Sequence, residues 1–333
     1  MSESPVFIVC SASSGSTLLS TLLDSHTRIM VGPELYFFNK PSVYEDFAQF
    51  RRKIRSWMRS GLLDNGQIAQ PAFLANLSRY GLTQEMVWEF AHEENDLAGF
   101  VERLFKVPLD ARGKHIWGEK TGSNAYCYSQ IKKLYPKAAF IHIVRNPLDA
   151  IASVVRRRNS VFRAACHWLY NNMACDIVSQ GGACIRITYE ELVTNPAGVV
   201  RSVCQSIGVE FESEMLERKA TSWDEHDSAN IHGSWRQRPS EAISTASIGA
   251  YARTLNSADV EMISRLRYRG MDGVSVSLCD VARSYGYELS ATRMRSMWRY
   301  RAMKCADSAW HIAKHARFAG KVRLEPINRF FFA

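Results

Sequence analysis

Short runs of apolar residues, many of them β-branched, recur along the chain and predict the strands of one buried sheet. They occupy residues 6–9, 29–31, 115–120, 138–144 and 184–188. Continuous apolar runs of this length are typical of parallel strands that are covered on both faces. We therefore expect these segments to form the centre of the fold.

Apolar residues at helical spacing follow most of these runs. Strands that alternate with helices are typical of a parallel sheet with right-handed crossovers, so the pattern predicts an α/β fold. More specifically, we expect a P-loop-like central parallel sheet flanked by helices. The expected helices begin near residue 16 and at Pro147, and cover about 123–135, 162–180, 257–268 and 291–318.

Two regions differ from this alternation. Residues 43–106 carry aromatic and apolar residues at helical spacing with little strand signal, which predicts a helical insertion that walls off a substrate cleft. Residues 290–333 hold ten Lys or Arg residues and two acidic ones, whereas the whole chain holds 42 basic and 33 acidic residues. We therefore predict a main domain at 1–289 and a basic C-terminal helical tail at 290–333.

Charge and composition disfavour several classes of protein. The net charge of +9 comes almost entirely from residues 290–333, so we expect no nucleic-acid-binding surface over the body. No apolar run approaches the roughly 20 residues of a membrane span, and the first residues lack the signature of a signal peptide. The eight cysteines are scattered without a Cys-x-x-Cys pair. We expect reduced thiols, no metal site and a cytoplasmic location.

The first candidate ligand-binding residues lie in a loop of small residues between the first strand and its helix. Backbone N–H groups and the positive end of the helix dipole converge at such a turn, which predicts a bound phosphate. A nucleoside triphosphatase would carry Lys where Ser16 stands, so that class is disfavoured. A turn that binds nothing is the alternative. The candidate ligands are Ser11, Ser13, Ser14, Gly15, Ser16 and Thr17.

Three charged residues stand at or just after the carboxyl ends of predicted strands, which is where ligands bind in open α/β sheets. They are Glu34, Lys120 and Arg145. An Arg in this place suits a doubly charged phosphate. His142, by contrast, lies inside a predicted strand, so we expect a core histidine there.

Arg145 and Ser153 stand eight positions apart after a strand, and Tyr189 is followed by Glu-Glu-Leu after another. Together with the loop, these features resemble the sulfotransferase family, whose members use 3′-phosphoadenosine 5′-phosphosulfate (PAPS). The resemblance implies that the loop holds the 5′-phosphosulfate, that Arg145 and Ser153 bind the 3′-phosphate, and that Tyr189 lies near the adenosine. Arg157, one helical turn after Ser153, is a candidate second cation.

Two details indicate which branch of the family the chain resembles. Glu34 lies 21 residues after Ser13, a spacing similar to that of the general-base Glu in tyrosylprotein sulfotransferases and related bacterial enzymes. The Gly-Glu-Lys that ends at Lys120 resembles the segment that supplies a Lys at the transferred sulfuryl group. The resemblance therefore implies Glu34 and Lys120 as catalytic residues. The family usually has Arg or Lys where this chain has Ser13, which removes a cation from the phosphosulfate.

We therefore expect a PAPS-dependent sulfotransferase that needs no metal and modifies a hydroxyl of a carbohydrate, a lipid or another small acceptor. A catalytically silent nucleotide-binding or membrane-associated module of the same fold is the alternative, and a P-loop kinase is third. The basic tail is expected either to contact an anionic membrane surface peripherally or to dock on the body. A polar loop at 221–247, with Trp223 and Trp235, is expected either to cover the ligands or to anchor packing.

Overall fold

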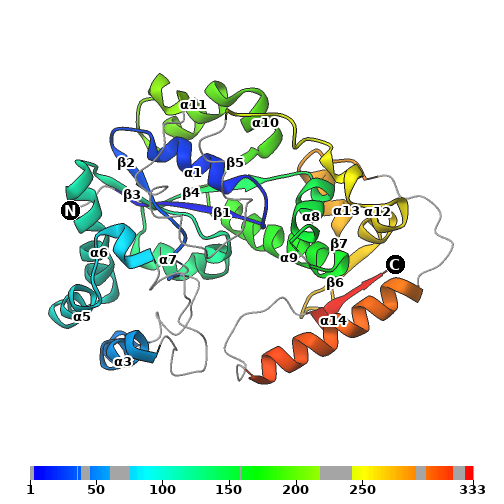
Figure 1. Cartoon of the computed structure of the whole chain (residues 1–333), viewed down its shortest axis with the longest axis horizontal. Coiled ribbons are helices and arrows are strands. Elements are labelled where there is room, and N and C mark those ends of the chain that lie inside the picture. The colour runs from blue at the N-terminus through cyan, green and yellow to red at the C-terminus, as the bar shows by residue number, and fades with distance from the viewer. Residues whose placement is uncertain are drawn as a thin grey trace.

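Figure 1 shows the chain as a computed structural model. Most of the loop expected at 221–247, including Trp223 and Trp235, lies outside the residues that the structure describes. The described residues are 4–35, 37–38, 46–60, 76–157, 159–182, 184–217, 242–289, 298–317 and 327–332.

Five parallel strands form the central sheet, in the order β2-β3-β1-β4-β5. Strand β1 lies in the middle, where Val6 pairs with Gly118 on one side and with Ala139 on the other. Each predicted strand is present, and the α/β fold class is confirmed. The strands are β1 (Val6–Cys10), β2 (Ile29–Val31), β3 (Ile116–Glu119), β4 (Ala139–Val144) and β5 (Cys184–Thr188).

Alternate residues of β1 point to opposite faces of this sheet. Val6 and Ile8 pack against helices α1, α10 and α11, whereas Phe7 and Val9 pack against α5, α6, α7 and part of α9. Figure 1 shows α10 and α11 on one side of the sheet and α7 on the other. Each fully buried side chain of this size contributes about 1.5–3 kcal/mol to folding stability. Burial on both faces therefore holds β1 in place, and with it the end of the sheet that carries the candidate site. These helices are α1 (Ser16–Asp24), α5 (Gln84–Glu93), α6 (Leu97–Arg112), α7 (Tyr128–Leu134), α9 (Val161–Gln180), α10 (Tyr189–Thr194) and α11 (Pro196–Ile207).

The helices expected between residues 43 and 106 are present in the described part of that region. Besides α5 and α6, they include α3 (Phe47–Ser60) and the 3-10 helix η1 (Ser78–Tyr80). Thr83 and Asp96 cap α5 and α6, because each side chain accepts a hydrogen bond from a backbone N–H of the first turn. Helix α6 extends past the expected boundary.

Two of the expected helices are shorter or less regular than predicted. The segment at 123–135 begins as the 3-10 helix η2 (Gly122–Cys127) and becomes α-helical only in α7. The segment at 257–268 is helical only in its first part, α12 (Ser257–Ser264). The other helices are α8 (Pro147–Val155), α13 (Leu278–Ser284), η3 (Ser213–Glu217), η5 (Ala250–Arg253) and η6 (Ile327–Arg329).

The second part of 257–268 is a strand, which corrects the helix prediction. Strand β6 (Leu266–Arg269) pairs antiparallel with β7 (Ser275–Ser277) and β8 (Phe330–Phe332) in a second sheet that the sequence analysis did not predict. Leu266 and Tyr268 are buried on one face, and the two arginines between and after them point the other way. This period of two is the property of a half-buried strand.

Helix α14 (Trp298–Arg317) contacts α9 and runs along the body in Figure 1. Tyr300 is 1% exposed and its hydroxyl donates to Asp259 Oδ1 at 2.9 Å, while Ser160 Oγ donates to Asp307. These contacts agree with the expectation that this segment docks on the body. Within the described residues, neither α14 nor any other helix is long and apolar enough to cross a bilayer.

His142 in β4 is a core histidine, as expected. Its side chain is completely buried, and Nε2 donates to Asn172 Oδ1 at 3.1 Å. The Asn172 oxygen is the acceptor because Asn172 Nδ2 donates to the Trp168 carbonyl. Burial lowers the pKa of His142 from 6.5 to about 4, so the ring is neutral in the folded protein at pH 7.

The stability of the protein should therefore depend on pH through His142. Below pH 6.5 the His142 ring binds a proton in the unfolded state, but in the folded state it does so only near pH 4. The free energy of unfolding therefore falls as the pH falls through this window. We expect the free energy of unfolding to drop by about 2–3 kcal/mol less in His142→Gln than in the wild type between pH 7 and pH 4.5. Urea denaturation at several pH values measures this. His92→Gln, which changes an exposed histidine, is the control, and equal drops in the wild type and His142→Gln would contradict the prediction.

Candidate functional site

The loop after β1 has the backbone shape of an anion cradle. Ser13 and Gly15 both have positive φ angles, 65° and 91°. A Cβ atom on Gly15 would lie 2.4 Å from Tyr189 Cδ2, so only glycine fits there. No side chain caps the start of α1 at Gly15, and no acidic residue occupies its first turn. The first N–H groups of this helix therefore have neither a side-chain cap nor a carboxylate in their own turn.

Several buried polar atoms around this loop have no hydrogen-bond partner among the described residues. They are Ser13 Oγ, Ser14 Oγ and Arg145 Nε. Buried polar atoms in native proteins are nearly always paired, so this concentration beside an uncapped helix end indicates a site for an anionic ligand. Ser11 differs, because its hydroxyl lies 3.5 Å from Nδ1 of His167 on α9.

Arg145 follows β4 and is held against the loop. Its Nη1 donates to the Ser13 carbonyl at 3.1 Å, and its Nη2 donates to the Ser247 carbonyl at 2.6 Å. The guanidinium carbon lies 4.4 Å from the centre of the Tyr189 ring, a cation–π distance. Only 6% of the residue is exposed. The structure thus brings together three of the predicted elements: the loop with its Gly15, Arg145 and Tyr189.

Asp149, in the first turn of α8, holds a late segment of the chain beside Arg145. Its Oδ2 accepts from the Gly249 N–H and its Oδ1 from the Tyr251 N–H, both at 2.8 Å. Because Ser247 of the same segment accepts from Arg145, the segment lies over the start of α8. Sequence reasoning did not identify Asp149 as part of the site, and it included Ser247 only as the last residue of the polar loop expected at 221–247.

Glu190 also joins backbone segments around Arg145. Its Oε1 accepts from the Asn146 N–H at 3.0 Å and its Oε2 from the Tyr287 hydroxyl at 2.6 Å. Burial and the Glu190 carboxylate together raise the pKa of Tyr287 well above its usual value. Asn146 adjoins Arg145 and Glu190 adjoins Tyr189, so this carboxylate joins the two backbone segments that carry the guanidinium and the ring.

Ser153 and Arg157 were also expected near Arg145. Ser153 is half-buried near the end of α8, and Arg157 is exposed just beyond that helix. The Arg145 guanidinium contacts the Ser13 and Ser247 carbonyls and the Tyr189 ring. A role for Ser153 and Arg157 therefore stays a prediction.

Glu34 and Lys120 meet at the same edge of the sheet as the loop. Lys120 Nζ lies 3.2 Å from Glu34 Oε1 and 3.4 Å from Thr17 Oγ1. The Lys120 side chain is 9% exposed and that of Glu34 is 23% exposed, so the pair is largely shielded from water. Cys10 lies close by, and burial raises its pKa to about 11, which keeps it a neutral thiol. The arrangement supplies one carboxylate and one ammonium beside the anion cradle.

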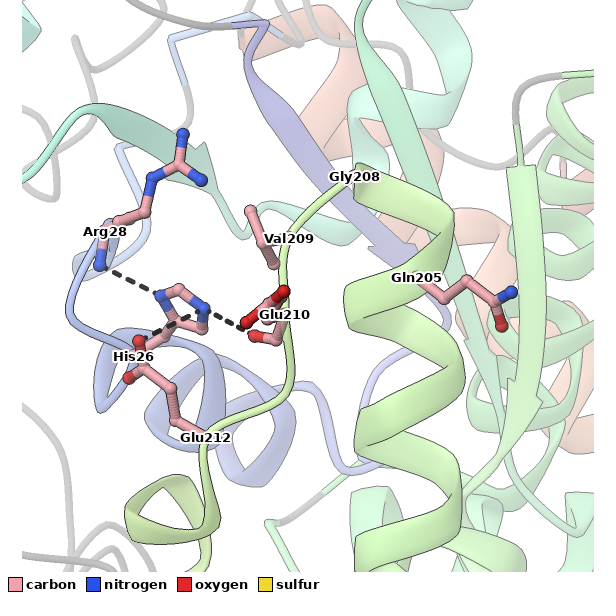
Figure 2. Close-up of a pocket in the computed structure, with 7 residues that line it drawn as sticks. All are labelled: His26, Arg28, Gln205, Gly208, Val209, Glu210 and Glu212. Carbon is pink, nitrogen blue, oxygen red and sulfur yellow. Dashed lines mark hydrogen bonds and ion pairs between the residues drawn. The ribbon is translucent and has the colours of Figure 1, made fainter.

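A pocket of about 540 Å³ lies at the opposite edge of the sheet, before β2 begins. Figure 2 shows the His26 ring beside Glu210 and Glu212, whereas the side chains of Arg28 and Gln205 point away from it. His26 Nε2 donates to the Glu210 carbonyl and its Nδ1 accepts from the Arg28 N–H, both at 2.9 Å. The Glu212 carboxylate accepts from the Thr27 N–H at 2.8 Å. This pocket is therefore separate from the candidate site. Among the residues described, no cluster of His, Cys, Asp or Glu could hold a metal ion.

A protein-tyrosine sulfotransferase A of Caenorhabditis elegans is 20% identical over 224 residues, which is 63% of this chain and 51% of that protein. The chain thus spans about half the length of the curated relative it matches.

Two solved structures share the fold. The sulfotransferase domain of the Synechococcus PCC 7002 olefin synthase superposes with a TM-score of 0.61 at 19% identity, covering 86% of this chain and 97% of that domain. The sulfotransferase domain from the curacin biosynthetic pathway superposes with a TM-score of 0.53 at 19% identity, covering 86% and 99%. The sequence profile of the sulfotransferase family matches residues 5–213, which include the loop, Glu34, Lys120, Arg145 and Tyr189. The chain belongs to the sulfotransferase family.

Proposed function

We propose that this protein transfers a sulfuryl group from PAPS to a hydroxyl of a carbohydrate, a lipid or another small acceptor. One observation carries the proposal. The three unpaired buried polar atoms, Ser13 Oγ, Ser14 Oγ and Arg145 Nε, surround an uncapped helix end at the same sheet edge as Glu34 and Lys120. An anion with two separate phosphate groups fits this set of donors.

The residues of the chain can perform the transfer as follows. The loop N–H groups and the start of α1 bind the 5′-phosphosulfate, and Arg145 binds the 3′-phosphate, for which a planar guanidinium is suited. Ser13 adds no charge, so Lys120 is the cation that lies beside the loop residue Thr17. Its ammonium stabilises the charge that develops as the sulfur–oxygen bond to the phosphate breaks.

Glu34 is the proposed base. The acceptor hydroxyl attacks the sulfur, its proton passes to the Glu34 carboxylate, and 3′-phosphoadenosine 5′-phosphate leaves. In the present structure Glu34 is paired with Lys120, so donor and acceptor must enter between or beside these two groups. General-base catalysis of this kind contributes about 10²–10⁴-fold.

A nucleotide-binding module without catalytic activity is the second candidate. It is favoured by Ser13, which supplies no cation where the family usually has Arg or Lys. The two candidates agree on nucleotide binding and differ on turnover.

A pair of measurements tests the proposal. Calorimetric titration should show binding of 3′-phosphoadenosine 5′-phosphate that is indifferent to Mg²⁺ and tighter than binding of ATP. Transfer of ³⁵S-sulfate from labelled PAPS to a panel of sugar, lipid and phenolic hydroxyls should then show turnover. Preference for ATP with Mg²⁺ would overturn the proposal, and nucleotide binding without any transfer would favour the silent module.

A further inference from the structure

Glu119 is a fully buried carboxylate at the end of β3, where the sequence analysis assigned no role. It is 0% exposed, and strand alternation places it on the same face as Trp117, which lies in the aromatic core. A carboxylate in such surroundings is unfavourable unless it is fully hydrogen-bonded. Burial raises the pKa of Glu119.

Four donors surround this carboxylate. Oε1 accepts from the Leu35 N–H at 3.2 Å and from the Thr121 hydroxyl at 2.5 Å. Oε2 accepts from the Thr121 N–H at 3.0 Å and from the Asn124 amide. The backbone N–H groups and the Asn124 NH₂ group can only donate, so the environment matches the ionised, acceptor-only form. These bonds oppose the effect of burial on the pKa of Glu119.

The positions of these donors relate Glu119 to the proposed chemistry. Leu35 is the neighbour of Glu34, and Thr121 is the neighbour of Lys120. The segment that carries Glu34 is also held from the helical region, because Asn76 donates to the Glu34 carbonyl at 2.9 Å and the Tyr80 hydroxyl donates to the Pro33 carbonyl at 2.8 Å. Neither of those bonds reaches the segment of Lys120. Glu119 bonds to both segments.

We propose that Glu119 is a positioning residue that sets the Glu34 carboxylate and the Lys120 ammonium in register by holding the backbone at Leu35 and Thr121. The assignment of reacting groups rests on the proposed function, whereas the coupling of the two segments does not. A displacement of about 1 Å in a reacting group can cost about 100-fold in rate. Glu119 touches neither donor nor acceptor in this role and acts only through its neighbours.

Hydrogen exchange tests the coupling without an activity assay. Glu119→Gln keeps the size of the side chain but turns an amide NH₂ toward the N–H of Leu35 or of Thr121, and each of these can only donate. Peptides that contain Leu35 and peptides that contain Thr121 should both exchange at least several-fold faster, while the melting temperature changes little. Glu102→Gln is the matched control, because Glu102 accepts from Trp117 Nε1 of the same strand at 3.3 Å. Unchanged exchange in either segment would overturn the proposal.

A milder variant covers the case in which Glu119→Gln does not fold. Thr121→Val removes one of the four bonds to the carboxylate. Because Glu119 hydrogen-bonds to both the Leu35 and the Thr121 segments, exchange in peptides that contain Leu35 should still rise. Leu35 is distant in sequence from the substitution. Exchange that rises only around Thr121 would contradict the coupling.

Kinetics with PAPS and the acceptor that gives the fastest transfer test the effect on catalysis. Glu119→Gln should lower kcat by about 10–100-fold and leave the KM for PAPS within about twofold. In the Glu34→Gln background the same substitution should cost less than it does in the wild type, since one of the two groups that Glu119 positions is already gone. Full additivity would overturn the positioning role. If Glu34→Gln itself is fully active while exchange remains coupled, the base assignment fails and the coupling by Glu119 stands.

Discussion

Arg145→Ala is expected to lower the affinity of the protein for 3′-phosphoadenosine 5′-phosphate by about 100-fold or more. Truncating one member of a buried, hydrogen-bonded charge pair typically costs about 2–5 kcal/mol, and each 1.4 kcal/mol is about tenfold in affinity. The substitution also removes the hydrogen bonds to the Ser13 and Ser247 carbonyls, so the loop and the late segment lose their shared donor. Isothermal titration calorimetry without Mg²⁺ measures the effect.

Arg201→Ala is the matched control for this experiment. Its guanidinium also lies 4.4 Å from the centre of an aromatic ring, that of Phe211, but it is exposed on α11. Its removal should leave nucleotide affinity unchanged. An affinity of Arg145→Ala within threefold of the wild type would show that the 3′-phosphate binds elsewhere.

Glu34→Gln is expected to lower kcat for sulfuryl transfer by about 10²–10⁴-fold, the usual contribution of a general base. The amide keeps the shape of the side chain but cannot take the proton of the acceptor hydroxyl. Nucleotide affinity should change little, because the proposed phosphate ligands lie in the loop and at Arg145. Transfer of labelled sulfate from PAPS under single-turnover conditions separates this loss from slow product release.

Glu212→Gln is the control, because the Glu212 side chain is 25% exposed against 23% for Glu34. It lies at the opposite edge of the sheet, beside His26 (Figure 2). Its replacement should leave the rate of transfer unchanged. Turnover by Glu34→Gln at the wild-type rate would assign the base to another group, and His167, whose ring lies beside Ser11, would be the next to replace.

The central sheet could be predicted because its signal is local. An apolar run such as Val6–Cys10 has few ways to be covered other than as an interior strand. The second sheet was missed for a physical reason. Met262, Ile263 and Leu266 continue the helical spacing of α12, and the alternation that marks β6 lasts only four residues. Its pairing with β8 depends on residues more than 60 positions away.

Part of the candidate site could also be predicted from the sequence. The rule that ligands gather at the carboxyl ends of parallel strands places Glu34, Lys120 and Arg145 at one edge, and the structure has Glu34 and Lys120 in contact. Glu119 and Glu190 each adjoin a predicted residue, so adjacency was an available signal. Asp149 and Ser247 gave no such signal, because their contacts join distant parts of the chain.

The central place of β1 has a consequence for the synthesis of this protein. The strand leaves the ribosome before its partner residues Gly118 and Ala139, which follow more than 100 positions later. At about 5–20 residues per second, the segment Val6–Cys10 waits at least about 5 seconds with both of its edges bare. During that interval it is an aggregation-prone, strand-forming segment. We therefore expect nascent chains that end before β4 to be bound by chaperones or to aggregate.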